Sequence, residues 1–171
     1  MSLYRIRNFI IAAVLLILAF VLQSTVFSRL PFLRSAPNLV LVMTFIYGYA
    51  GSKIVGMITG MMGGLMLDVF FCDVIGYHAL ILLIIGFISG VWDSFFYSDD
   101  LYVPPILLIL SDLFYCIVYF VVWYVLKAKF DFGYYLLHIM LPEFLLTFIA
   151  GVILYKPISL LITRLKEVPE Q

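Results

Sequence analysis

The sequence predicts an all-α integral membrane protein built as one bundle of about six transmembrane helices. Hydrophobic residues make up 65% of the 171 residues, charged residues only 12%, and the mean hydropathy is +1.19. An ordinary soluble domain is about 45–50% apolar and about 25% charged. The apolar runs suit a bilayer core of about 30 Å, and their connections have ordinary loop lengths. We therefore expect a single transmembrane domain over residues 1–171.

The first predicted helix covers residues 8–27 and follows Arg5 and Arg7. No small-residue cleavage site follows the apolar run, so we interpret it as an uncleaved transmembrane helix and not as a signal peptide. Arginine remains on the cytoplasmic side of membranes, so the N-terminus is expected in the cytoplasm. Pro31 and Pro37 delimit the next loop, and Pro37 suits the first turn of a helix.

Residues 38–71 are too long for one ordinary span and contain Lys53. We interpret them as two helices, over 38–50 and 52–71, that meet near Gly51. The alternative is one long kinked helix, because pairs of small residues permit sharp bends.

Three further helices are predicted over residues 77–96, 104–126 and 134–165. A turn ending at Gly76 precedes the first of them, and Pro142 is expected to kink the last. An even number of spans puts both termini on one side of the membrane.

The distribution of basic residues predicts which side that is, since the side richer in Lys and Arg is cytoplasmic. The cytoplasmic side would carry Arg5, Arg7, Lys53, Lys156, Arg164 and Lys166, and the outer side Arg29, Arg34, Lys127 and Lys129. Both termini are therefore expected in the cytoplasm, with the protein crossing the cytoplasmic membrane several times.

Small residues recur at every fourth position around the third predicted helix. They are Gly48, Ser52, Gly56, Gly60 and Gly64, followed by Asp68. On a helix, positions i and i+4 share a face, so these residues form a stripe that is almost without side chains. Glycine costs about 1 kcal/mol in a helix interior, whereas small residues let membrane helices approach closely. We interpret the stripe as a helix-packing face or a partner-docking face, and a glycine-lined binding groove is the alternative.

Ionisable residues inside predicted spans are functional candidates, because burying them in a membrane is expensive. They are Asp68, His78, Asp112, His138 and Glu143. For Asp112 and Glu143 a structural polar clasp and a contact to a partner or ligand both remain open. The two histidines are interpreted as hydrogen-bonded interfacial residues and not as ligands or switches.

The sequence lacks the motifs of the common catalytic sites. It contains no His-Glu-x-x-His, no Gly-x-Ser-x-Gly and no Walker-type phosphate loop. An aspartyl protease would need two carboxylates sharing a proton, which Asp68 and Asp112 could supply only if they met. Cys72 and Cys116 have no partner at metal-ligand spacing and are expected to be inert thiols. Zero net charge predicts no nucleic-acid partner. We expect no enzyme activity, cofactor or metal.

Three segments resemble the family of the bacterial rod shape-determining protein MreD. They are LQSTVFSRL (22–30), PNLVLV (37–42) and GLMLDVFFCDVIGYHAL (64–80). The strongest matches are Gly64, Leu65, Asp68, Gly76, His78, Ala79 and Leu80. The resemblance covers roughly the first half of the chain. Relatives often have Pro-Asp where this chain has Pro37-Asn38, so a role that needs a carboxylate there is not expected.

The resemblance implies a non-enzymatic scaffold of the cell-elongation machinery, which controls peptidoglycan synthesis and rod shape. Such a scaffold binds the transmembrane helix of MreC and, through it, works with MreB, RodZ, RodA and a class B penicillin-binding transpeptidase. The fold is similar to the substrate-binding subunits of energy-coupling-factor transporters, so the alternative function is uptake of a vitamin-type small molecule. The first helix lacks the Ala-x-x-x-Ala pattern by which those subunits dock, which favours the scaffold.

Overall fold

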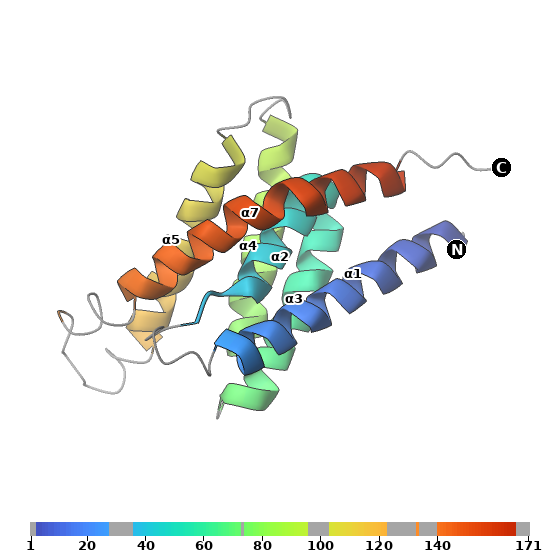
Figure 1. The fold of residues 1–171 in the computed structure, drawn as a ribbon. Coiled ribbons are helices and arrows are strands. Elements are labelled where there is room, and N and C mark those ends of the chain that lie inside the picture. Colours follow the sequence, from blue (N-terminus) through green and yellow to red (C-terminus); the bar gives the residue numbers. More distant parts are fainter. Residues whose placement is uncertain are drawn as a thin grey trace.

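The computed structural model describes residues 3–27, 36–72, 74–95, 103–122, 133 and 140–166. These residues form an all-α fold without strands, which confirms the predicted fold class (Figure 1). The α-helices are α1 (Leu3–Val21), α2 (Leu39–Ile46), α3 (Lys53–Phe71), α4 (Tyr77–Phe95), α5 (Val103–Phe120) and α7 (Leu141–Lys166). Two π-helical segments, Leu22–Val26 and Tyr47–Gly51, continue α1 and α2.

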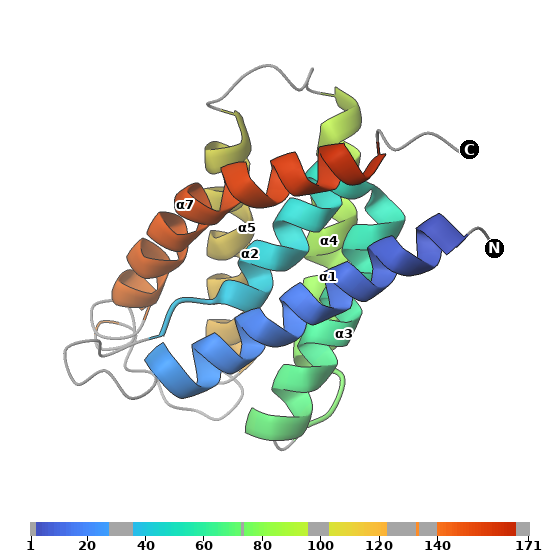
Figure 2. The same ribbon diagram turned by 45° about the vertical axis from the view of Figure 1, so that its right-hand side comes forward.

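Helix α2 is the centre of the bundle. It contacts α1, α3, α4, α5 and α7, and every residue from Leu39 to Ile46 is buried. In both ribbon views α2 lies between α1 and α7, with α3, α4 and α5 behind it (Figures 1 and 2). A helix that is apolar on all sides is stable only where other elements surround it. The start of α1 and the end of α7 lie at the same end of the bundle (Figure 1).

Residues 38–71 form two helices that are separated at Ser52. The backbone of Ser52 is extended (φ −169°, ψ 161°), and its side chain accepts a hydrogen bond from the Val55 N–H. Asn38 caps α2 in the same way, through its side-chain oxygen and the Leu41 N–H at 3.1 Å. Ser and Asn favour these positions because they satisfy N–H groups that have no partner inside the helix.

Four of the described helices are long and apolar enough to cross a membrane. They cover Arg7–Val26, Lys53–Phe71, Val103–Phe120 and Leu141–Leu165. Leu39–Gly51 and Tyr77–Trp92 are shorter apolar helices. A total of six crossings therefore remains a prediction.

The expected kink at Pro142 stays a prediction, because residues 134–139 on its N-terminal side lie outside the described residues. Within α7, Pro142 lies in the first turn and Pro157 lies inside the helix. A proline in the first turn removes only an N–H that has no intrahelical partner. His138 and the rest of 134–139 lie outside the described residues, as do residues 123–126 at the predicted end of the preceding helix.

Candidate functional site

The glycine stripe lies against α4 of the same chain. Gly56, Gly60 and Gly64 leave no room there for a side chain. A Cβ atom at Gly64 would overlap the backbone of Ala79, and one at Gly60 would overlap the Leu82 carbonyl. The two backbones are therefore in direct contact, as expected for small-residue packing between membrane helices.

Helix α4 contributes glycines of its own to this contact. A Cβ atom at Gly86 would overlap the backbone of Gly56, and one at Gly90 would overlap the backbone of Lys53. Gly48 lies against Ser89, and Ser52 caps α3. Because α4 covers Gly48, Gly56, Gly60 and Gly64, these glycines form a helix-packing face within the chain and leave no open glycine-lined groove there. The stripe predicted the face of α3 but not which helix covers it.

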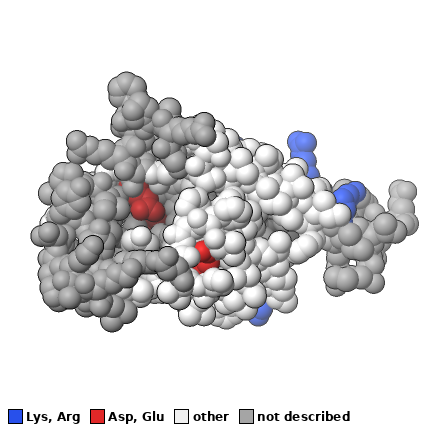
Figure 3. Space-filling view, turned by 90° about the horizontal axis from the view of Figure 1, so that it is seen from below, with Lys and Arg blue, Asp and Glu red and all other residues white. Residues whose placement is uncertain are grey.

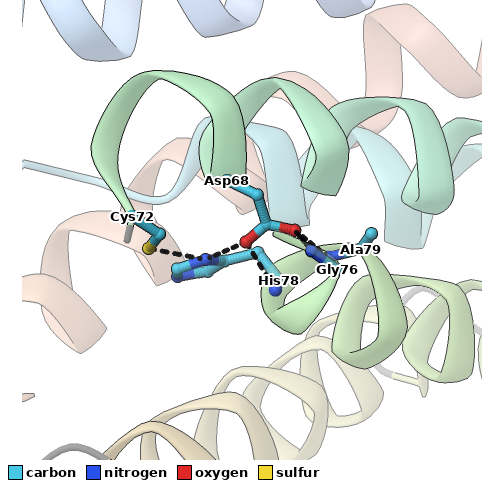
Figure 4. Close-up of polar contacts among 5 residues, drawn as sticks. All are labelled: Asp68, Cys72, Gly76, His78 and Ala79. Carbon is cyan, nitrogen blue, oxygen red and sulfur yellow. Dashed lines mark hydrogen bonds and ion pairs between the residues drawn. The ribbon is translucent and has the colours of Figure 1, made fainter. Parts of the chain in front are cut away.

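Asp68 joins the end of α3 to the start of α4 (Figure 4). Its fully buried carboxylate accepts hydrogen bonds from the backbone N–H groups of Gly76 (2.9 Å), His78 (2.9 Å) and Ala79 (3.1 Å). These donors belong to the start of a helix, where N–H groups have no intrahelical acceptor and a negative charge is favoured. Gly76 makes the turn with φ at +101°, a conformation that side chains disfavour.

The His78 ring lies between Asp68 and Cys72. Its Nδ1 atom is 2.9 Å from Asp68 Oδ1 and 3.3 Å from Cys72 Sγ. In a nucleophilic triad the orienting acid and the nucleophile contact different ring nitrogens. Here both contact Nδ1, so the arrangement does not form a Cys-His-Asp triad. Both Asp68 oxygens accept hydrogen bonds from the α4 start, so Asp68 does not form the proton-sharing pair with Asp112 that an aspartyl protease needs.

The sequence interpretation missed Cys72 as a member of this cluster. The spacing Asp-x-x-x-Cys, which places Asp68 and Cys72 one turn apart on one face of α3, is the signal that could have found it. The contact of His78 with Asp68 and Cys72 depends on the turn at Gly76, and residue spacing alone does not predict it.

Aromatic rings surround His78. Its ring centroid lies 4.9 Å from that of Tyr77, 6.0 Å from Tyr115 and 6.2 Å from Tyr119. Tyr115 and Tyr119 belong to one face of α5, so this cluster packs the start of α4 against the end of α5. Aromatic pairs at such distances stabilise by about 0.5–1.5 kcal/mol beyond burial.

A cleft of about 250 Å³ opens beside this cluster. Five elements contribute to it: the continuation of α1, the end of α3, the start of α4, the end of α5 and the start of α7. Its described lining is Phe20, Gln23, Ser24, Ala36, Leu67, Phe71, Cys72, His78, Tyr115, Tyr119 and Glu143. The cleft thus combines apolar walls with a small number of polar groups.

Asp112 and Glu143 lie near one another in the bundle. Asp112, on α5, is fully buried, and neither of its carboxylate oxygens has a hydrogen-bond partner among the described residues. Glu143 lies in the first turn of α7, lines the cleft and interacts electrostatically with Asp112. Burying a polar group without a hydrogen-bond partner is energetically costly. A structural clasp at Asp112 would need such a partner, and none is found among the described residues.

Positive and negative side chains are partly separated in the bundle. On the face drawn in Figure 3, two of the basic patches lie at the right of the view and a third lies near the middle, while the acidic patches lie in the middle and at the left. Among the basic residues whose side chains the structure describes, Arg7, Lys53, Lys156 and Arg164 are all exposed.

Comparison with known proteins agrees with the sequence resemblance. The model of the family described as rod shape-determining protein MreD matches residues 4–165. This range extends well beyond the first half of the chain, in which the resemblance was noticed. No curated protein and no solved structure matches the chain.

Proposed function

Because the chain belongs to the MreD family of rod shape-determining proteins, we propose that it is a non-enzymatic scaffold that binds the transmembrane helix of MreC. Family membership assigns the chain to rod shape determination, and its long apolar helices are those of a membrane protein. The family match over residues 4–165 is the observation that carries the proposal. The lack of a triad at Cys72, His78 and Asp68 supports a role without catalysis.

Through MreC the scaffold would act on the rest of the cell-elongation machinery. The indirect partners in this proposal are MreB, RodZ, RodA and a class B penicillin-binding transpeptidase. A rigid bundle suits this role, because it fixes the position of a bound helix. The direct backbone contact between α3 and α4 supplies such rigidity.

The partner helix would dock beside α5 and α7, where Asp112 and Glu143 lie. Glu143 is half-buried and lines the cleft, so it is the carboxylate that a polar side chain of that helix would reach, whereas Asp112 lies fully buried near it. Ser, Thr, Asn, Gln and His form hydrogen bonds between membrane helices, each contributing about 0.6–2 kcal/mol. This location replaces the glycine stripe as the docking face, because α4 already covers the stripe.

The test is recovery of MreC with the tagged, full-length protein from detergent-solubilised membranes. Asp112→Asn combined with Glu143→Gln is expected to lower MreC recovery about tenfold, which corresponds to about 1.4 kcal/mol. Lys156→Gln is the matched control, since it removes an exposed charge from α7 far from the acidic pair and is expected to leave recovery unchanged. Normal MreC recovery with a folded double variant would refute this docking site.

Uptake of a vitamin-type small molecule is the competing function. Ligand pockets commonly have volumes of about 300–1,000 Å³, and the described cleft, at about 250 Å³, is smaller. The two functions also differ in gene neighbourhood. A position beside the genes for MreC and MreB supports the scaffold, and one beside vitamin genes supports transport.

A further inference from the structure

We propose that Asp68, Cys72 and His78 form a binding site for a divalent cation of the zinc class, a property independent of MreC binding. One ligand atom from each residue lies within 4.8 Å of the other two. The Asp68 Oδ1 to His78 Nδ1 distance is 2.9 Å, and the His78 Nδ1 to Cys72 Sγ distance is 3.3 Å. Figure 4 shows the three side chains converging between the end of α3 and the start of α4.

The donor set selects the class of metal. A thiolate, an imidazole and a carboxylate are the ligands that zinc uses, whereas calcium and magnesium bind sets composed of oxygen. Zinc bonds of about 2.0–2.3 Å in a tetrahedron separate oxygen from nitrogen by about 3.3 Å and nitrogen from sulfur by about 3.6 Å. The observed separations of 2.9 and 3.3 Å are shorter by only a few tenths of an ångström. The ion would be admitted by side-chain movements that bring these three ligand atoms, which lie within 4.8 Å of one another, to the zinc distances.

The surroundings already orient the ligands. Backbone N–H groups of Gly76, His78 and Ala79 hold the Asp68 carboxylate and would remain in place when the ion binds. Such second contacts fix ligand orientation in metal sites. Cys72 follows Asp68 by one turn, and its N–H donates to the Asp68 carbonyl at 3.1 Å. The ring of Tyr77 packs edge-on against His78.

The proton balance of binding is simple. The ion takes the place of the proton on His78 Nδ1, and the neutral imidazole carries its proton on Nε2 instead. The Cys72 thiol loses its proton to solvent, so binding releases one proton and depends on pH. Cys72 and His78 both line the cleft, which leaves room for water as a fourth ligand. Three protein ligands with one open position are common for zinc.

Cobalt(II) absorption tests the site directly, because thiolate ligation of Co²⁺ produces a charge-transfer band in the near ultraviolet. We expect the purified full-length protein to develop this band with Co²⁺ and to lose it when Zn²⁺ is added. Cys116→Ala is the matched control, since it removes the chain's other cysteine, which is buried on α5, and should retain the band. Cys72→Ser should abolish it. No band in the folded wild-type protein, or a band that persists in Cys72→Ser, would overturn the proposal.

Thiol labelling tests the site in a protein that retains all three proposed ligands, and a ligand variant serves as the control. In the Cys116→Ala protein only Cys72 remains to react with a maleimide. Zn²⁺ is expected to slow this reaction at least about tenfold, and a chelator is expected to restore the rate. Adding His78→Gln should remove the protection by Zn²⁺. A labelling rate that Zn²⁺ leaves unchanged would identify the cluster as a hydrogen-bonded clasp and would reject the metal site.

Discussion

Asp68 and Asp112 are two buried carboxylates in opposite hydrogen-bonding situations. Asp68 accepts three backbone hydrogen bonds and one from His78, while Asp112 has no hydrogen-bond partner among the described residues. A hydrogen bond to a charged group is worth about 1.5–3 kcal/mol, and donors left without their acceptor add a penalty. The same change, carboxylate to amide, should therefore have different effects at the two positions.

Asp68→Asn is expected to destabilise the protein by roughly 3 kcal/mol, because the amide nitrogen cannot accept the hydrogen bonds that one carboxylate oxygen now accepts. Thermal unfolding in detergent measures this as a lower midpoint temperature. A midpoint equal to that of the wild type would show that the link between α3 and α4 does not depend on this carboxylate.

Asp112→Asn is the comparison, and it should leave the unfolding midpoint unchanged or raise it. The reason is that no described hydrogen bond is lost at Asp112 and a costly buried acid is removed. If the variant is as stable as the wild type, the lower MreC recovery expected of the double variant does not come from instability at Asp112. A large loss of stability would instead indicate a structural clasp at Asp112.

At the contact between α3 and α4, two effects of replacing a glycine oppose each other: higher helix propensity stabilises the protein, and overpacking destabilises it. Replacing glycine by alanine in a helix interior ordinarily stabilises by about 1 kcal/mol. At Gly60 the added Cβ atom would overlap the Leu82 carbonyl, and overpacking costs about 1–3 kcal/mol. The sign of the stability change therefore shows which effect dominates.

Gly60→Ala is expected to lower the unfolding midpoint, because the backbone of α4 cannot move away without losing the neighbouring contacts. Gly51→Ala is the matched control, since its Cβ atom would meet only the Val55 side chain at an ordinary 3.7 Å. Unfolding curves of the two variants in the same detergent decide the question. If Gly60→Ala is as stable as Gly51→Ala, the close approach of the helices does not limit stability.

The elements were predictable to different degrees. Apolar runs predicted the helices that became α1, α3 and α5, because a bilayer demands long uninterrupted segments. Ser52 separates α2 from α3 by capping the start of α3 with a hydrogen bond. From the sequence alone, one kinked helix was also possible. The partner of the glycine stripe was not predictable, since periodicity identifies a helix face but not the helix that covers it.

The candidate site was predicted in part. Asp68 and His78 were singled out as ionisable residues within apolar segments, but Cys72 was interpreted as an inert thiol. Their meeting depends on the Gly76 turn, whose left-handed backbone returns α4 against α3. Contacts that depend on the path of a turn are not encoded in residue spacing. Asp112 and Glu143 interact electrostatically from two helices that are distant in sequence, and neither the hydrophobic pattern nor the charges of the sequence specify that pair.

The whole molecule separates its charges in part. On the face drawn in Figure 3, two of its three basic patches lie to one side of the acidic patches, and the third lies near the middle of the molecule. The side of a membrane protein that is richer in Lys and Arg is the cytoplasmic side. This partial separation supports the proposed orientation, with both termini cytoplasmic and the Asp68, Cys72 and His78 cluster near the outer surface.

Reporter fusions to Gln171 test the orientation of the intact protein. A fluorescent protein that matures only in the cytoplasm should be bright in this position, and alkaline phosphatase, which is active only outside, should be inactive. In intact cells, a membrane-impermeant thiol reagent should label Cys72, because the proposed orientation places this residue near the outer surface. An active phosphatase fusion would reverse the proposed orientation.

The enclosure of α2 has a consequence for biosynthesis. The backbone N–H of Asn38, at the start of α2, donates to Thr147 on α7 at 2.9 Å, although 109 residues separate them. A segment as short as Leu39–Gly51 is poorly suited to reside alone in lipid. During synthesis of the later helices, α2 is not yet covered by α7. The Asn38 N–H also lacks its acceptor, because Thr147 has not yet been synthesised. We therefore expect the bundle to reach its final packing only after α7 has been inserted and has packed against α2.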